Sequence, residues 1–322
     1  MQKIIKDGAR KAVARDDVKY VLGWTPGYGF RVSPFFARTA EDTERLIFSP
    51  LCANNLTIYL TLQEKLPLPK AAALDKRKIA LFVKGCDSRA VIQLIAERGI
   101  SRDELVILGV PCGGVIDISK LEAKFPQAIK VEAVEEGEKL SLKVDGKSQE
   151  IPKEDILLKK CSLCEYPNPL IYDVLLGEEK QKKTKDYQGI STFEEKSPNE
   201  KWTYWGDKFA RCIRCYACRN ICPLCYCDSC ILDKLSPQWI RRSVNLSENT
   251  VFQLLRTFHL TGRCIGCGEC ERACPMGIPV GELNRKLEKD VRELFAYEPG
   301  IDIEEKSLLS QFKPEDSEDF IL

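Results

Sequence analysis

Two short apolar runs define the first third of the chain. Residues 79–83 and 105–110 are almost continuously apolar, and residues 88–98 between them carry apolar side chains at helical spacing. Runs of this length are typical of strands that are buried on both faces. A strand, a helix and a strand within about thirty-five residues form a unit whose two strands are parallel. With a further strand at 18–24, the pattern predicts an α/β domain with a small, mainly parallel sheet.

The segments that follow set the domain boundaries. Residues 129–151 alternate between apolar and polar and contain an Asp-Gly pair, which favours a β-hairpin. Residues 178–201 are charged and poor in aliphatic side chains, which is typical of a solvated linker. We therefore expect the α/β domain at 1–177, a charged linker at 178–201 and a second domain at 202–322. The alternative is a functional role for the charged run.

Composition limits the kinds of chemistry that the chain can carry out. It has 322 residues, 49 basic and 48 acidic, and 16 cysteines against one histidine. A net charge of +1 gives no electrostatic surface for nucleic acid, and no apolar run is long enough to span a membrane. The charged N-terminus does not resemble a secretory signal. Many cysteines in a long chain indicate metal or redox use in a reducing cytoplasm rather than a disulfide scaffold.

Two cysteine runs in the second domain repeat one spacing, C-x2-C-x2-C-x3-C-P. Bacterial-type ferredoxins hold 4Fe–4S clusters with this pattern, and two copies are a strong signal. In two-cluster ferredoxins the fourth cysteine of each run binds the other cluster. We therefore assign one cluster to Cys212, Cys215, Cys218 and Cys274, and the other to Cys264, Cys267, Cys270 and Cys222.

The segments around these runs are expected to be helical. Ser247 is the predicted N-cap of a helix at 248–259, and residues 279–296 are predicted to form a closing amphipathic helix. The second domain is therefore predicted to be mainly α-helical and ferredoxin-like. The expected apolar face of the first helix consists of Val251, Leu254, Leu255 and Phe258.

Four further cysteines are candidates for a third cluster. Cys86 and Cys112 follow the two buried strands, and the carboxyl ends of parallel strands are where open α/β sheets place their ligand sites. Cys161 and Cys164 form a C-x2-C pair, and the four thiols together match the number that a 4Fe–4S cluster needs. A zinc site or unliganded thiols are the alternatives. Three neighbouring glycines would let the backbone approach a cofactor and donate amide N–H groups to it: Gly85, Gly113 and Gly114.

The remaining cysteines have weaker patterns. Three that closely follow Cys222 suggest a small metal site or alternative cluster ligands, with packed or reactive thiols as the other interpretation: Cys225, Cys227 and Cys230. Zinc would need a fourth ligand there. Cys52 has no cysteine neighbour in sequence and is expected to be a buried thiol.

Three segments resemble a known family. Residues 82–87 (FVKGCD), 109–114 (GVPCGG) and 160–164 (KCSLC), with Asp173 downstream, are similar to the beta subunits of coenzyme F-420-reducing hydrogenase and to related formate dehydrogenase beta subunits. The resemblance covers about 78–177. It implies one 4Fe–4S cluster beside a flavin, electron exchange with a deazaflavin or a partner subunit, and, position by position, the ligands Cys86, Cys112, Cys161 and Cys164.

The second domain has a resemblance of its own. Residues 212–219 (CIRCYACR) are similar to dicluster parts of electron-transfer subunits found with heterodisulfide-reductase-like complexes and anaerobic sulfite reductases. In the F-420 family, a long segment after the C-x2-C pair helps to build the flavin site. The charged linker and the dicluster domain take its place here, and no G-x-G-x-x-G fingerprint is present. Both features argue against FAD.

These observations predict an iron–sulfur electron-transfer subunit of an anaerobic, cytoplasmic oxidoreductase complex. Three 4Fe–4S clusters would relay single electrons between a flavin-, hydrogenase- or formate-dehydrogenase-type partner and a catalytic subunit. The expected partners are redox subunits: heterodisulfide-reductase-like, hydrogenase, formate dehydrogenase or flavoprotein. One alternative is a flavin-containing reductase subunit that uses a deazaflavin or a nicotinamide. A structural zinc protein is the other.

Overall fold

The computed structural model describes residues 1–62, 75–136, 139–311 and 314. Its chain contacts divide it into two compact units. The first contains Met1–Thr57, Leu68–Arg89 and Ile100–Lys185, and the second contains Ile58–Pro67, Ala90–Gly99 and Asp186–Leu322.

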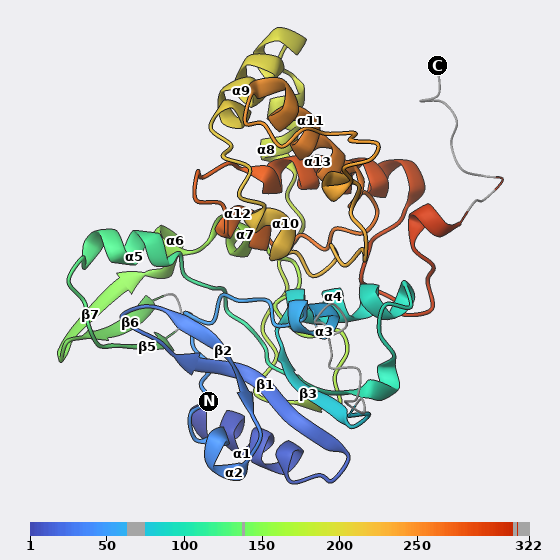
Figure 1. Ribbon diagram of the computed structural model, residues 1–322. Helices are drawn as coiled ribbons and strands as arrows, with labels where there is room; N and C mark the ends of the chain where they lie inside the picture. The colour runs from blue at the N-terminus through green and yellow to red at the C-terminus, as the bar shows by residue number, and fades with distance from the viewer. Residues whose placement is uncertain (63–74, 137–138, 312–313, 315–322) are drawn as a thin grey trace. The chain divides into compact units, whose positions relative to one another are not determined.

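The first unit is built on a five-stranded sheet of order β2-β1-β3-β4-β8. Its strands β1, β3, β4 and β8 are parallel to one another, and β2 is an edge strand that pairs antiparallel with β1. The predicted parallel unit is therefore confirmed, and β1, β2 and β3 lie side by side in Figure 1. The strands are β1 (Val18–Pro26), β2 (Val32–Ala37), β3 (Lys78–Val83), β4 (Leu105–Gly109) and β8 (Val174–Leu175).

Short helices connect the strands. The helix predicted between the two apolar runs is α4 (Gly85–Ala96), which begins directly after β3. Residues Ile58–Leu62 form α3. The other helices before Lys185 are α1 (Gln2–Val13), α2 (Ala40–Thr43), α5 (Ile118–Lys124), α6 (Lys153–Ile156) and α7 (Lys159–Ser162).

The predicted hairpin is part of a three-stranded antiparallel sheet of β5 (Val131–Glu136), β6 (Lys139–Val144) and β7 (Lys147–Pro152). Asp145 and Gly146 join β6 to β7 with φ of 47° and 85°. Positive φ at both turn residues is what a two-residue hairpin turn requires, and Asp-Gly adopts it readily. Alternate residues of β6, Leu140 and Leu142 among them, are buried in a separate apolar core.

The second unit contributes helices between Asp186 and residue 311, a range that is described throughout and holds no strand. The closing helix α13 matches the segment predicted at 279–296. In this unit α11 packs against α9 and α13, and α10 packs against α12; their ribbons are labelled in Figure 1. The helices are α8 (Gln188–Glu194), α9 (Pro198–Ala210), α10 (Ala217–Asn220), α11 (Leu246–Phe258), α12 (Glu269–Arg272) and α13 (Val280–Phe295).

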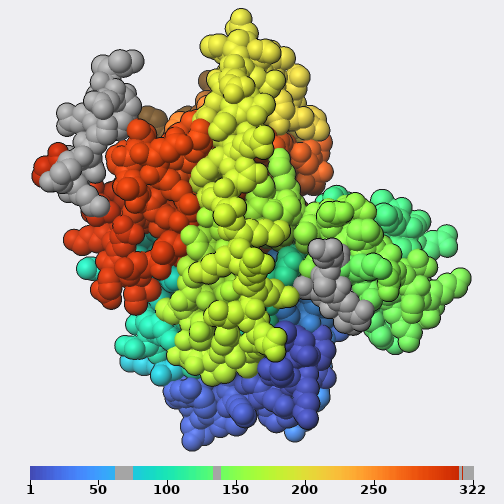
Figure 2. All heavy atoms as spheres, turned by 180° about the vertical axis from the view of Figure 1, so that it is seen from behind, coloured from blue at the N-terminus to red at the C-terminus, as the bar shows by residue number. Residues whose placement is uncertain are grey.

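The charged segment 178–201 contains helical turns as well as irregular chain. None of its side chains is buried, and it lies on the face shown in Figure 2, in yellow-green. The division between the units at Lys185 falls inside it. It also contains α8 and the first turn of α9, which begins at an N-cap, Ser197, whose hydroxyl accepts from Glu200 N. The domain bounds 1–177 and 202–322 stay a prediction.

The face that α11 buries differs from the predicted one. Val251, Leu254 and Phe258 are 48%, 37% and 57% exposed, so the apolar-face prediction was wrong for three of its four members. The helix instead buries a mainly polar face: Asn249, Thr250, Phe252, Gln253, Arg256 and Thr257. The N-cap is Asn245 rather than Ser247, since the Asn245 side chain accepts from Glu248 N.

Glu97 is the centre of a hydrogen-bond network in the second unit. Its carboxylate accepts from Arg263 Nε at 2.6 Å and Nη2 at 2.5 Å, from the Tyr226 hydroxyl at 2.6 Å, and from Gln93 Nε2 at 2.7 Å. The Glu97 side chain is 7% exposed. Because Arg263 directly precedes Cys264, the network holds the start of the second cysteine run in place.

Replacing Glu97 with alanine is expected to destabilise the protein by about 3 kcal/mol, because the Arg263 guanidinium, whose side chain is only 17% exposed, then loses its counter-charge. Glu293→Ala is the control, since the Glu293 side chain is 61% exposed and its 3.9 Å ion pair with Lys289 is worth about 0–1 kcal/mol. Urea unfolding of the anaerobically purified chain measures both. Equal effects of the two variants would contradict the role given to Glu97.

Candidate metal centres

The two cysteine runs have the same backbone shape. In the first run Arg214 and Tyr216 have φ of 53° and 59°, and in the second Gly266 and Gly268 have φ of 65° and 63°. These residues occupy equivalent places around the second cysteine of each run, and a four-residue helix follows in both, α10 and α12. Left-handed residues turn successive amide N–H groups toward one side, which forms a concave anion-binding surface.

Arg214 adopts this conformation without being glycine, which costs about 1–2 kcal/mol. Its own side chain offsets that cost. It is buried, donates to Glu248 O at 2.8 Å and Arg241 O at 3.2 Å, and lies 4.5 Å from the Phe252 ring. Strained residues that persist in this way cluster at functional sites, so the loop geometry fits a bound group.

Donors from three different segments point at cysteine sulfur. Ile278 N lies 3.4 Å from Cys274 Sγ, Gln253 Nε2 lies 3.5 Å from Cys212 Sγ, and Asn284 Nδ2 lies 3.7 Å from Cys270 Sγ. Amide donors to sulfur are the contacts that stabilise anionic thiolate and sulfide, and they help to set cluster potentials. This donor set fits a 4Fe–4S cluster.

The fourth cysteine of each run lies with the other run. Burial and the neighbouring thiols of Cys270, Cys212 and Cys274 together raise the pKa of Cys218 to about 11. The chain thus brings Cys274 of the second run to the cysteines of the first.

The reciprocal placement holds for Cys222. Burial raises the pKa of Cys264 well above its ordinary value, and the neighbouring thiols that add to this are Cys267, Cys270 and Cys222. Both placements agree with an exchange of the fourth cysteine between the runs, and the two ligand sets stay a prediction.

Of the three extra cysteines, Cys225 lies beside Cys222. A hydrogen bond between Cys225 and Cys222 raises the pKa of Cys222 and lowers that of Cys225. Cys227 is exposed and Cys230 is half-buried. Among the residues that the structure describes, no three His, Cys, Asp or Glu side chains are grouped as ligands of a single ion; the thiols of a 4Fe–4S cluster bind four separate irons. An extra metal site at these three cysteines stays a prediction.

The four cysteines of the first unit lie near one another. Burial raises the pKa of Cys112 to about 12, with Cys161 and Cys164 adding to the effect. The pKa of Cys86 is also raised, first by burial and then by the Asp87 carboxylate. The Cys164 thiol is a further neighbour that raises it. The side chains come from the start of α4, the loop that follows β4 and the segment that contains α7, so the sheet topology brings them together.

Glycines and amides complete this group. Gly114 N lies 3.4 Å from Cys112 Sγ, and Val115 N lies 3.3 Å from Cys161 Sγ. Gly114 has φ of 109°, a value that side-chain-bearing residues avoid. At Gly85 a Cβ atom would stand 1.8 Å from the carbonyl oxygen of Tyr166. Gly85 and Gly114 therefore allow backbone segments to meet around the thiols, and a cofactor contact of Gly85, Gly113 and Gly114 stays a prediction.

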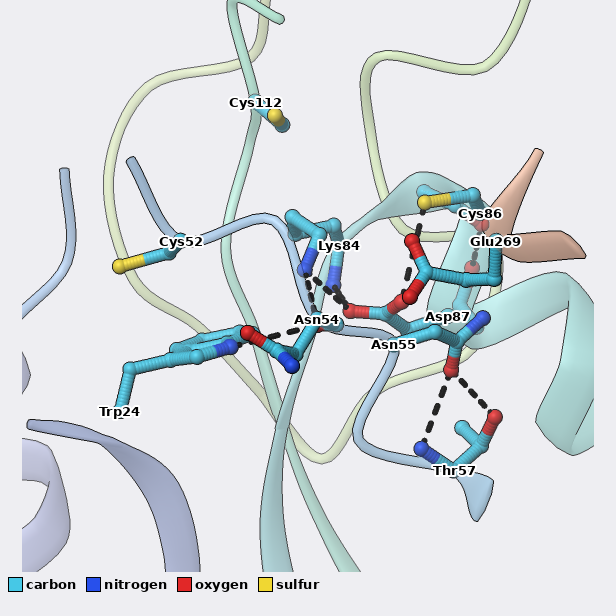
Figure 3. Close-up of polar contacts among 12 residues, drawn as sticks. Trp24, Cys52, Asn54, Asn55, Thr57, Lys84, Cys86, Asp87, Cys112 and Glu269 are labelled. Atoms are coloured by element: carbon cyan, nitrogen blue, oxygen red, sulfur yellow. Dashed lines mark hydrogen bonds and ion pairs between the residues drawn. The ribbon is translucent and has the colours of Figure 1, made fainter. Parts of the chain in front are cut away.

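A buried lysine accompanies this site (Figure 3). Lys84 is 1% exposed, and its Nζ lies 3.0 Å from Asp87 Oδ2 and 2.9 Å from Asn54 O, over the Trp24 ring at 4.2 Å. Burial lowers the pKa of Lys84, but attraction to Asp87 and to the thiols of Cys86 and Cys112 outweighs it. The four-cysteine group therefore has a fixed positive charge beside it.

Cys52 is buried as predicted, and burial raises its pKa to about 11. The residues that sequence reasoning missed are the polar donors: Gln253, Arg256, Asn284 and Lys84. Along the described parts of the chain, no helix has the length and apolar character that crossing a membrane requires.

Comparison with known proteins identifies the two parts of this arrangement. Residues 211–279, which contain both cysteine runs, match the family described as a 4Fe-4S dicluster domain. The chain is 26% identical over 291 residues to the F420-dependent formate dehydrogenase subunit beta of Methanocaldococcus jannaschii, covering 72% of this chain and 76% of the relative.

Two further relatives extend the comparison. The F420-dependent formate dehydrogenase 1 subunit beta of Methanococcus maripaludis is 26% identical over 293 residues, covering 72% of this chain and 75% of the relative. Cobalamin reductase PduS of Citrobacter freundii is 38% identical over 84 residues, covering 26% of this chain and 17% of its own. The predicted resemblance is confirmed: the chain combines similarity to formate dehydrogenase beta subunits with a 4Fe–4S dicluster domain, and it is an iron–sulfur protein of electron transport.

Proposed function

We propose that the protein is the electron-transfer subunit of a formate-dehydrogenase-type oxidoreductase and that it carries three 4Fe–4S clusters in one chain. The crossed placement of Cys274 and Cys222 supports the two clusters of the cysteine runs, because it offers each of them a fourth thiol. When bound, a 4Fe–4S cluster takes up and releases one electron at a time and makes no substrate bond.

The residues of the second unit hold and solvate the two clusters. Cys212, Cys215, Cys218 and Cys274 form one ligand set, and Cys264, Cys267, Cys270 and Cys222 form the other. Cys215 and the neighbouring Ile213 are exposed, so the first cluster lies where a partner's redox centre can approach it. This favours a mainly α-helical, ferredoxin-like dicluster domain that delivers electrons to, or accepts them from, another subunit.

The third cluster belongs to the first unit. The mutual proximity of Cys86, Cys112, Cys161 and Cys164 supports it, as do the two amides that donate to Cys112 and Cys161. Lys84 supplies a positive charge beside a group that holds four thiolates. The relatives' names point to a formate dehydrogenase complex as the partner, and a reducing cytoplasm is the expected location.

A reductive titration of the anaerobically purified chain tests this function. A brown absorbance that bleaches with dithionite, with about three electron equivalents taken up per chain, is expected from three one-electron clusters. A colourless chain that binds zinc would contradict the proposal. A yellow chromophore that is extracted after removal of iron would instead favour the flavin-containing reductase.

A further inference from the structure

Arg256 is a buried arginine without an ordinary partner. It lies on α11 and is 2% exposed. None of its three guanidinium nitrogens has an oxygen or nitrogen acceptor in the described part of the chain. An isolated buried charge of this kind is strongly unfavourable. The protein therefore needs an anion at this place.

The surroundings of Arg256 identify that anion. The groups with the strongest electrostatic attraction to its guanidinium are four thiols: Cys270, Cys218, Cys222 and Cys225. Cys218 belongs to one proposed ligand set, and Cys270 and Cys222 belong to the other. The guanidinium consequently lies among ligands of both clusters.

Two further polar side chains on the buried face of α11 donate to the first cysteine run. Gln253, one turn before Arg256 on the same buried face, lies 3.5 Å from Cys212 Sγ. Asn249, a further turn back, donates to the carbonyl oxygens of Phe209 and Cys212 at 3.0 and 2.8 Å. Asn249 fixes the first run, Gln253 reaches a ligand sulfur, and Arg256 brings the positive charge.

We propose that Arg256 is the shared counter-charge of the two clusters: its N–H groups donate to cluster sulfur, and its charge raises the reduction potential of both. This inference rests on the two-cluster site of the proposed function. Uptake of one electron from the external reductant makes a cluster one unit more negative, and no proton is transferred, because guanidinium stays protonated. The guanidinium favours the more negative state, and the water-poor interior strengthens that attraction.

Arg256→Gln, which keeps N–H donors and removes the charge, tests this role in the full chain. In an EPR-monitored redox titration, the ratio of reduced to oxidised cluster at the wild-type midpoint should fall at least tenfold for both clusters. For a one-electron couple this is a shift of about 59 mV to lower potential. Arg256→Lys, which keeps the charge, should change the ratio less than about threefold, and Arg242→Gln, at an exposed position, should leave it unchanged.

Iron content separates the outcomes. If Arg256→Gln loses iron while Arg256→Lys keeps it, cluster assembly depends on the positive charge, and this result supports the proposal. Unchanged midpoints in an iron-loaded Arg256→Gln chain, a shift in one cluster alone, or equal loss of iron in both variants would overturn the proposal. Absence of clusters from the wild-type chain would instead overturn the proposed function, so the two failures are distinguishable.

Discussion

Replacing Cys222 with alanine is expected to remove the 4Fe–4S cluster whose other ligands are Cys264, Cys267 and Cys270, and to leave the cluster of the first run in place. The physical reason is the proposed exchange of ligands between the runs. The Cys222 thiol lies close enough to Cys264 to raise its pKa, as do the thiols of Cys267 and Cys270. The chain should lose about four irons, the content of one cluster. Iron analysis and EPR of the reduced chain measure the loss.

Two further variants make this test specific. Cys227→Ala, at an exposed thiol, is the control and should keep all of the iron. Cys225→Ala addresses the thiol that is hydrogen-bonded to Cys222. Loss of the cluster held by Cys212, Cys215 and Cys218, with the other cluster retained, would contradict the crossed assignment. Full iron in Cys222→Ala together with loss of iron in Cys225→Ala would make Cys225 the ligand.

Gly85→Ala should have the largest effect in the first unit. A Cβ atom there would lie 1.8 Å from the carbonyl oxygen of Tyr166 and 2.9 Å from that of Asn168. Both obstacles are backbone atoms of the segment after Cys164, so relief requires that segment to move. We expect a destabilisation at or above the upper end of about 1–3 kcal/mol. Loss of the third cluster should accompany it, because the displaced segment directly follows two of the proposed ligands, Cys161 and Cys164.

Gly189→Ala is the matched control for Gly85→Ala. No atom lies within 4 Å of a Cβ built at Gly189, which is in helix α8, so alanine should be neutral or slightly stabilising there. Urea unfolding and iron analysis distinguish the two glycines. A Gly85→Ala chain with wild-type stability and iron content would show that the close backbone approach plays no part in holding the site.

The α/β part could be predicted because its information is local. The continuous apolar runs around β3 and β4 specify buried strands, and the intervening α4 makes them parallel. The rule for parallel sheets then places Cys86 and Cys112 at one edge. The close approach of the Tyr166 carbonyl to Gly85 is a contact between residues far apart in the sequence. No local sequence pattern predicts it.

The buried face of α11 could not be found from apolar spacing. That spacing assumes an apolar core, whereas this helix buries Gln253 and Arg256 among cysteine thiols. A polar stripe on a helix usually faces water. Apolar spacing therefore predicted that the opposite face of α11 would be buried. A cysteine-rich core is polar, and the helix that covers it exposes Val251 and Phe258 instead.

The strained loop positions had a signal that comparison of the two runs would reveal. Arg214 and Tyr216 stand where the second run has Gly266 and Gly268, and all four have positive φ. Glycine at a repeated place indicates a left-handed backbone. The equivalent residues of the other run then inherit the same expectation, even though they carry side chains.

The central claim is that one chain holds three 4Fe–4S clusters. Mössbauer spectroscopy of the chain purified anaerobically from cells grown on ⁵⁷Fe, combined with iron analysis, tests it most directly. Three clusters would give about twelve irons per chain, all with the parameters of 4Fe–4S clusters. About eight irons, with Cys86, Cys112, Cys161 and Cys164 holding zinc or no metal, would contradict it.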